Sequence, residues 1–330
     1  MSGEKQGEML DVEMLDVEML DVEMLDVEML DAEFVIIGAA IIDVLVRPVS
    51  EEVFQTGSCA AEDIRMSPGA DALNEATILS RMGKKVRLET VIGDDKAGRY
   101  LMEHCRENGI KVSEDCVKEG LVTGINVVLV QEDGRRNFLT NPKGSLRSLG
   151  LKDIRMPFPK SAGIVCFASI FVFPQLKTEE LEAIFAQVKR ENKILCADMT
   201  KCKSQETAEE MAPALRYVDY LLPNDEEAMI LTQTDTVEQA AEVLCSTGVS
   251  NVVIKCGKQG CYVRNIRENI RMWVPAVPDV KCVDTTGAGD SFVAGFLYAL
   301  SEGKGIRECA EYANLCGSKA VQVMGASEWI

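Results

Sequence analysis

Residues 284–292 read DTTGAGDSF and lead directly into an apolar segment that predicts a helix over 288–301. Three small residues at such a point let backbone N–H groups face a concavity at the helix N-terminus, where the partial positive charge favours phosphate or a developing anion. Asp290 lies inside that pocket and would repel bound phosphate. Removal of a proton from an attacking alcohol gives this carboxylate a use. The stretch matches neither a P-loop nor a Rossmann fingerprint.

The second half of the chain alternates between strand and helix patterns. This alternation predicts a parallel sheet with helices on both faces. The expected strands are 164–167, 194–197, 220–222 and 252–255, and the expected helices between them are 178–190, 205–215 and 226–245. A strand pair near Tyr262 and Trp273 and two helices, 288–301 and 306–323, complete this half.

The first half opens with β-branched strand patterns at 34–37 and 41–46, followed by a helical pattern at 72–82. Short strands near 53–64 and 124–139 do not fit the alternation, and they predict a small β-sheet that departs from the main one. No Pro/Gly/Ser-rich linker divides the chain, so we expect one main α/β domain over 34–330.

The N-terminal segment 1–33 has a composition unlike the rest. It holds twelve acidic residues against Lys5, so it carries −11 of the net charge of −18. From Met9 to Glu33 the pentapeptide MLDVE occurs four times and is followed by MLDAE. A five-residue period forms no lasting apolar stripe on a helix. We expect a disordered tail, which is either an acidic interaction segment or a tandem duplication.

Composition excludes several classes of function. The remaining 297 residues carry −7 and contain no basic block, which argues against a nucleic-acid partner. No apolar run reaches the ~18 to 20 residues of a membrane span. Twelve Cys without a secretory signal indicate reduced thiols and a cytoplasmic location. No CxxC pair occurs and His104 is the single histidine, which argues against structural zinc and against His-dependent nucleophiles.

Two separated motifs resemble the signatures of the PfkB (ribokinase-like) family of carbohydrate kinases. Residues 284–290 match the C-terminal signature DTxGAGD, and residues 68–76, PGADALNEA, running on to Gly83, resemble the N-terminal one. The resemblance extends in order from 34 to about 326. The runs 38–43, 71–77 and 143–146 are similar to those of uncharacterised bacterial PfkB sugar kinases. The resemblance implies a three-layer α/β/α sandwich with a mostly parallel central sheet and a small β-sheet lid.

The resemblance also implies residues that hold the acceptor. Asp43 and Asn74 would bind sugar hydroxyls, which suits a carboxylate that accepts and an amide that both donates and accepts. Gly69 would let the backbone approach the sugar, and Asp71 would accept a further hydroxyl. Lys143, or Arg136, would meet a carboxylate if the acceptor is a sugar acid.

The remaining implied roles concern catalysis, ATP and cations. Asp290 corresponds to the catalytic base, and the amides of Gly287, Ala288 and Gly289 correspond to the anion hole for the transferred phosphate. Asn224 and Glu227 match an NxxE element that organises Mg²⁺ and its waters, although the same spacing also reads as a capped helix start. The nucleotide positions are Lys255, Gly257, Gly260 and Asn314, and Lys255 replaces the Thr that is usual in the family. A loop that binds a monovalent cation such as K⁺ in the family corresponds to Asp284, Thr286 and Gly325.

We therefore expect ATP-dependent phosphorylation of a hydroxyl on a ketose or sugar acid, by a homodimer that pairs through the lid. A nucleoside kinase of the same fold is one alternative. A sugar-binding protein with weak catalysis is another, because the family usually continues beyond 325–326 with a further element and this sequence stops at 330. Ala70 also departs from the family, which commonly has a second Gly there, and this matters if the backbone φ is positive.

Overall fold

The computed structural model describes residues 31–132 and 135–330. The predicted tail of 1–33 lies outside them except for its last three residues. Those three residues pack on the domain: Ala32 is fully buried, its amide donates to Ser161 Oγ (3.0 Å), and Asp31 pairs with Lys85 (2.6 Å). The ordered domain thus includes residues 31–33, slightly before the expected boundary.

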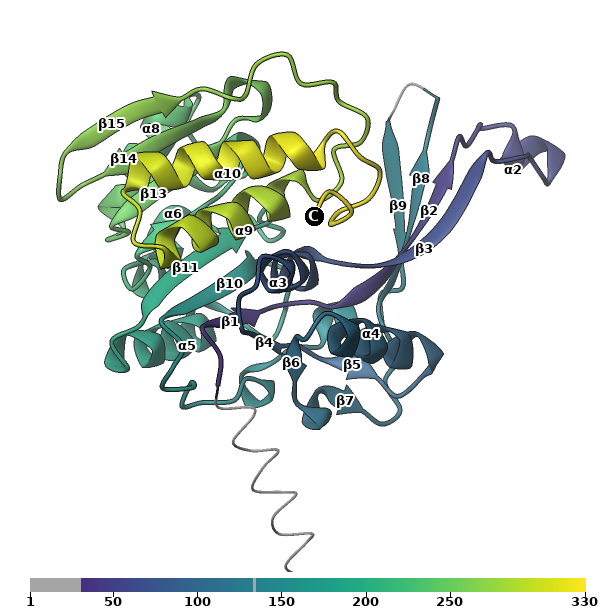
Figure 1. The fold of residues 1–330 in the computed structure, drawn as a ribbon, viewed down its shortest axis with the longest axis horizontal. Coiled ribbons are helices and arrows are strands. Elements are labelled where there is room, and N and C mark those ends of the chain that lie inside the picture. The colour runs from purple at the N-terminus through teal and green to yellow at the C-terminus, as the bar shows by residue number, and fades with distance from the viewer. Residues whose placement is uncertain (1–30, 133–134) are drawn as a thin grey trace, which may run out of the picture.

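A nine-stranded sheet forms the centre of the molecule, in the order β15-β14-β13-β12-β11-β10-β1-β4-β6 (Figure 1). Its pairings are parallel apart from those of β14, which runs antiparallel to both neighbours. The strands are β1 Phe34–Ile37, β4 Val86–Glu89, β6 Lys111–Val112, β10 Ile164–Ile170, β11 Ile194–Met199, β12 Tyr220–Leu221, β13 Asn251–Lys255, β14 Cys261–Asn265 and β15 Ile270–Val274.

Helices cover both faces of this sheet because strand side chains alternate between two separate apolar cores. Val35 and Ile37 belong to one core and Phe34 and Ile36 to the other. The first core is closed by α5 Thr178–Arg190, α6 Ala208–Leu215, α7 Asp225–Thr232 and α8 Val237–Ser246, and the second by α3 Asp71–Arg81, α4 Lys96–Glu107, α9 Ala288–Ser301 and α10 Ile306–Ala320. This is the expected three-layer sandwich.

One predicted helix, 226–245, is divided in the structure. Gln233 adopts the left-handed conformation (φ 55°) and ends α7, and Thr236 then caps α8 by accepting from the Gln239 amide at 3.3 Å. A left-handed residue stops helical propagation, and the Thr cap fixes a new start. The apolar periodicity of the segment did not reveal this break.

A four-stranded sheet projects from the body, in the order β3-β2-β8-β9, and reaches away from the sandwich in Figure 1. Its strands are β2 Ile41–Arg47, β3 Asp63–Gly69, β8 Ile125–Val130 and β9 Arg136–Thr140. The strand expected near 53–64 is instead a helical turn, α2 Val53–Thr56, closed by Gly57 at φ 80°, and the strand begins at Asp63.

The remaining elements are short. A separate two-stranded sheet pairs β5 Ile92–Gly93 with β7 Val117–Lys118. Single 3₁₀ turns occupy Glu114–Cys116, Ser145–Arg147, Leu151–Asp153 and Gly257–Gln259. None of the helices within residues 31–132 and 135–330 is long and apolar enough to span a bilayer.

Ala70 precedes α3 with φ 78° and ψ 152°, a conformation in which a side chain is strained and glycine is not. We predict that Ala70→Gly raises the free energy of unfolding by about 1 kcal/mol, measured by urea denaturation. Ala76→Gly, in the buried interior of the same helix, is the matched control and should lower it by about 1 kcal/mol. Equal losses in the two variants would contradict the strain at Ala70.

Candidate active site

The two sequence signatures meet through one hydrogen bond. Asn74 Nδ2, on α3, donates to Asp290 Oδ2, in the first turn of α9, at 2.6 Å. Asp71, the first residue of α3, accepts from the Ser169 hydroxyl near the end of β10. The helix starts of α3 and α9 therefore face the carboxyl end of the central sheet, where ligands bind in open α/β folds.

Two glycines permit this close approach. Gly287 has φ 68°, and a Cβ built on it would lie 2.5 Å from Ala326 Cα, so a side chain would displace the loop that positions Asp290. A Cβ on Gly69 would lie 2.0 Å from Asp43 Oδ2. Gly69 thus leaves room for the Asp43 carboxylate and, with it, for the predicted acceptor contact.

Asp43 reaches the site from β2 of the projecting sheet. It stands opposite Asn126 of β8, whose side chain donates to it, and Asn126 Oδ1 in turn accepts from Thr140 Oγ1 at 2.7 Å. Burial raises the pKa of Asp43 to about 6, with the Asn126 hydrogen bond lowering it and the charge of Asp71 raising it. The sequence did not single out Asn126, because its role depends on the register between two strands about 80 residues apart.

Asp290 titrates near neutrality. Burial is the main cause that raises its pKa to about 7, and the negative charges of Asp71 and Asp198 add to it. The hydrogen bond from Asn74 and the Lys255 ammonium act in the opposite direction. A carboxyl with this pKa can exchange a proton with a substrate hydroxyl at physiological pH.

Lys255 forms an ion pair with Asp198 beside the same helix start. Burial alone would lower the pKa of Lys255, but the charges of Asp198 and Glu227 raise it, so the ammonium stays protonated. Asp198 lies at the end of β11 and was missed in the sequence. A lone Asp that directly follows the apolar strand residues 194–197 was the available signal, because the ends of parallel strands face ligands.

Asn224 and Glu227 cap α7 reciprocally. Glu227 N donates to Asn224 Oδ1 and Asn224 N donates to Glu227 Oε2, both at 2.8 Å. The capped-helix interpretation is therefore confirmed, and the role toward Mg²⁺ stays a prediction. The start of α7 lies beside Lys255, since Asn224 pairs with Lys255 as an isolated parallel bridge.

A cavity of about 720 Å³ is bounded by the predicted nucleotide residues Lys255, Gly257, Gly260 and Asn314. Ala288 and Gly289 also line it, together with an apolar wall that includes Val277, Val280, Phe292 and Val321. Amides at a helix start beside an apolar wall fit the phosphates and the base of a nucleotide. Asn314 holds the backbone beside this wall, because its Nδ2 donates to the carbonyls of Val274 and Pro275 at 3.1 Å.

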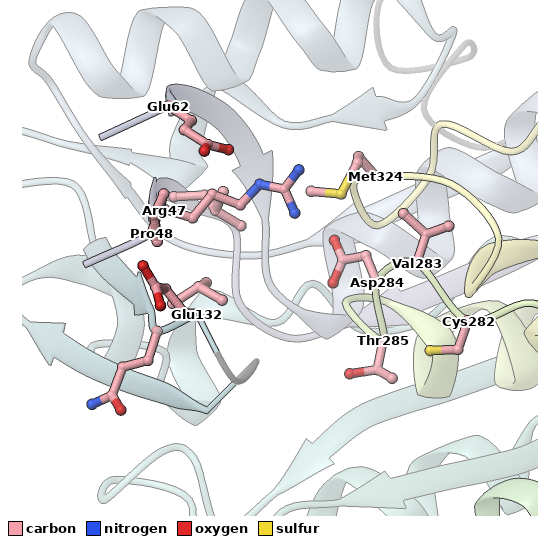
Figure 2. Close-up of a pocket in the computed structure, with 12 residues that line it drawn as sticks. Arg47, Pro48, Glu62, Glu132, Cys282, Val283, Asp284, Thr285 and Met324 are labelled. Carbon is pink, nitrogen blue, oxygen red and sulfur yellow. The ribbon is translucent and has the colours of Figure 1, made fainter. Parts of the chain in front are cut away.

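A second cavity, of about 680 Å³, lies between the projecting sheet and the loop before α9 (Figure 2). In Figure 2 the Arg47 guanidinium points from the sheet across this cavity toward Met324 and Asp284. Cys282 and Thr285 line both cavities, so the two spaces adjoin along the loop before α9.

The three positions expected to hold a monovalent cation do lie together. Asp284 Oδ1 accepts from the Thr286 amide (3.0 Å) and hydroxyl (2.7 Å), and Oδ2 accepts from the Gly325 amide (3.1 Å). The carboxylate thus clasps the C-terminal segment to the loop. In the described part of the chain no group of three or more His, Cys, Asp or Glu is arranged to hold a metal.

Lys143 is exposed in the turn before the Ser145–Arg147 helix. Among the described residues no hydrogen bond or ion pair joins it to Asp43, Asp71 or Asn74. Its predicted contact with an acceptor carboxylate stays a prediction.

The raised pKa of Asp290 predicts a pH-dependent effect on stability. The folded state keeps this proton up to about pH 7, whereas the unfolded chain releases it near pH 4, so stability falls as pH rises through this window. As the pH rises from 5 to 8, the free energy of unfolding of Asp290→Asn should therefore increase by about 2 kcal/mol relative to that of wild type, measured by urea denaturation. For the exposed control Asp235→Asn, the difference in free energy of unfolding from wild type should not change with pH. A difference that is equally independent of pH for Asp290→Asn would contradict the raised pKa.

Comparison with known proteins agrees with this architecture. The chain is 28% identical over 252 residues to a protein named as an uncharacterized sugar kinase of Archaeoglobus fulgidus, covering 76% of this chain and 96% of that one. The structure of a ribokinase from Thermotoga maritima superposes with a TM-score of 0.74 at 26% identity, covering 91% and 96% of the two chains. Arabidopsis thaliana ribokinase, solved with ribose and ATP, shares the fold with a TM-score of 0.72 at 24% identity, covering 91% and 95%.

The family model for pfkB family carbohydrate kinases matches residues 31–330, a span that includes all of the described residues. Members of this family transfer phosphate to an alcohol group of a carbohydrate. The chain therefore belongs to the pfkB family of carbohydrate kinases.

Proposed function

We propose that this protein transfers the γ-phosphoryl group of ATP to a hydroxyl of a ketose or sugar acid, with Asp290 as the general base. The observation that carries the proposal is the hydrogen bond between Asn74 and Asp290 (2.6 Å). It joins a residue suited to bind a sugar hydroxyl to a carboxyl that titrates near pH 7 at a helix N-terminus.

The reaction then follows from the chain's own groups. Asp43 and Asp71 accept hydrogen bonds from acceptor hydroxyls, and Asn74 holds the acceptor beside Asp290. Asp290 takes the proton of the attacking hydroxyl as its oxygen bonds to the γ-phosphorus and the bond to the leaving ADP oxygen breaks. The amides of Gly287, Ala288 and Gly289 at the start of α9 stabilise charge on the transferred group.

The cofactor positions follow the same arrangement. ATP supplies the phosphoryl group from the cavity lined by Lys255, Gly257, Gly260 and Asn314. Glu227, whose pKa is raised by burial, would organise Mg²⁺ through water. The clasp of Asp284, Thr286 and Gly325 is the proposed place for a monovalent cation such as K⁺.

Two carboxylates near the acceptor favour a polyhydroxylated substrate over a nucleoside base. The names of the relatives are consistent with this, since they include probable fructokinases and ribokinases, and one neighbour was solved with ribose. A panel of ketoses, hexoses, aldonates and nucleosides with ATP tests the acceptor class. Best turnover on a nucleoside would reject the sugar assignment.

Asp290→Asn should lower kcat by at least about 100-fold, because the attacking hydroxyl loses its base, and should leave the Kd for the acceptor within about threefold. Initial rates of ADP release and calorimetric titration with the best acceptor of the panel measure the two quantities. Asp235→Asn is the surface control. An Asp290→Asn variant with wild-type kcat would refute the assignment of the base.

We further propose that residues 34–330 form the kinase unit and that the projecting sheet is a lid that pairs between two copies. One face of the sheet carries the cross-strand row Met66–Val44–Val127–Leu139, and Met66 and Leu139 are 57% and 58% exposed. Ile64, on the same face, is 67% exposed. An exposed apolar face of this kind indicates a protein contact, and a second copy presents the same face.

Met66→Glu should convert a dimer into a monomer, because it places a charge in the centre of this face. Light scattering at several protein concentrations measures the mass. Leu315→Glu, at a 38% exposed position on α10, is the matched control and should not change it. A wild-type monomer, or a Met66→Glu dimer, would contradict pairing through this sheet.

A further inference from the structure

Lys255 occupies an unusual position for a lysine. It ends β13 with its side chain only 14% exposed and paired with the 8% exposed Asp198, and it also lines the nucleotide cavity. A buried lysine that served stability alone would not need to face a cavity. Burying an ion pair is weak evidence for stability, because desolvation offsets the attraction.

The ammonium lies against the first turn of α9. A Cβ built on Gly289 would be 3.8 Å from Lys255 Nζ, and Gly289 directly precedes Asp290. The charge of Lys255 is accordingly among those that act on Asp290. The lysine thus reaches the amides that form the proposed anion hole.

The surrounding charges give this ammonium a function. Asp198, Glu227 and Asp290 face it, and Asp71 faces Asp290 from α3. Such a set of carboxylates repels the phosphates of ATP. A helix N-terminus carries only a partial positive charge, so it offsets only part of this repulsion. A fixed full positive charge at the point of transfer removes the repulsion where charge is redistributed in the transition state.

We propose that Lys255 is a catalytic residue whose ammonium, held in place by Asp198, hydrogen-bonds an oxygen of the transferred phosphoryl group. This inference rests on the proposed kinase function. Lys255 keeps its proton throughout, since the proton of the acceptor hydroxyl passes to Asp290. The acceptor oxygen bonds to the γ-phosphorus as the bond to the ADP oxygen breaks. Asp198 is a positioning residue, because it acts through Lys255.

The first test compares nucleotide binding, which needs no acceptor and no turnover. Lys255→Met should weaken binding of a non-hydrolysable ATP analogue at least tenfold and change binding of ADP less than threefold, by calorimetry with Mg²⁺ present. Lys189→Met, which breaks the partly buried pair with Asp219, is the matched control. Equal losses for the analogue and ADP, or no loss for either, would overturn the contact.

The second test measures catalysis with the best acceptor. Lys255→Met should lower kcat at least 100-fold with the acceptor KM nearly unchanged, and Lys255→Arg should recover part of it because the charge returns. Lys255→Met/Asp198→Asn removes both charges of the buried ion pair, so it keeps both tests possible if the single variant fails to fold. A folded variant without the lysine that keeps kcat within threefold would overturn the proposal.

The two tests separate this inference from the proposed function. Wild-type protein that phosphorylates no acceptor in the panel would refute the kinase function, and the comparison of ATP analogue with ADP would still decide whether Lys255 faces the terminal phosphate. Wild-type turnover together with an unaffected Lys255→Met variant would refute the inference alone.

Discussion

Mutual repulsion among carboxylates at the carboxyl end of the central sheet is the constraint on which the site depends. Asp71, Asp198 and Asp290 converge there, and each unpaired buried charge is costly. Behind them Glu75 is fully buried, and burial together with the charges of these neighbours raises its pKa well above the usual value. The remaining charge is offset by Lys255, by the Asn74 amide and by the N-termini of α3 and α9.

The sandwich architecture supplies these groups from fixed elements. Ser169, Asp198 and Lys255 come from the ends of the parallel strands β10, β11 and β13, and the β-sheet core holds their spacing. Asp43 comes from the projecting sheet, so any movement of that sheet would change the acceptor site while leaving Asp290 in place. Gly69 and Gly287 allow the contacts between these parts, because any side chain at either position would collide with Asp43 or Ala326.

The sequence predicted the parts of the fold and site that depend on local patterns. The succession of strand and helix patterns predicted the parallel sheet, and the small residues before 290 predicted the start of α9. It did not predict Asn126 or Asp198, because their importance comes from strand register and from the neighbours of a strand end. The break at Gln233 and the helical turn at Val53–Thr56 were missed for a related reason, since single backbone conformations override periodicity. The sequence indicated that Ala70 would be strained if its backbone φ were positive, and φ is 78° in the structure.

The central claim is that a carboxyl poised near neutrality removes the acceptor's proton, and the pH dependence of kcat/KM for the acceptor tests it most directly. A base with a pKa of about 7 must be ionised to act, so kcat/KM should be level above this value and fall about tenfold for each pH unit below it. A profile that stays level down to pH 5, in protein that remains folded, would contradict the account.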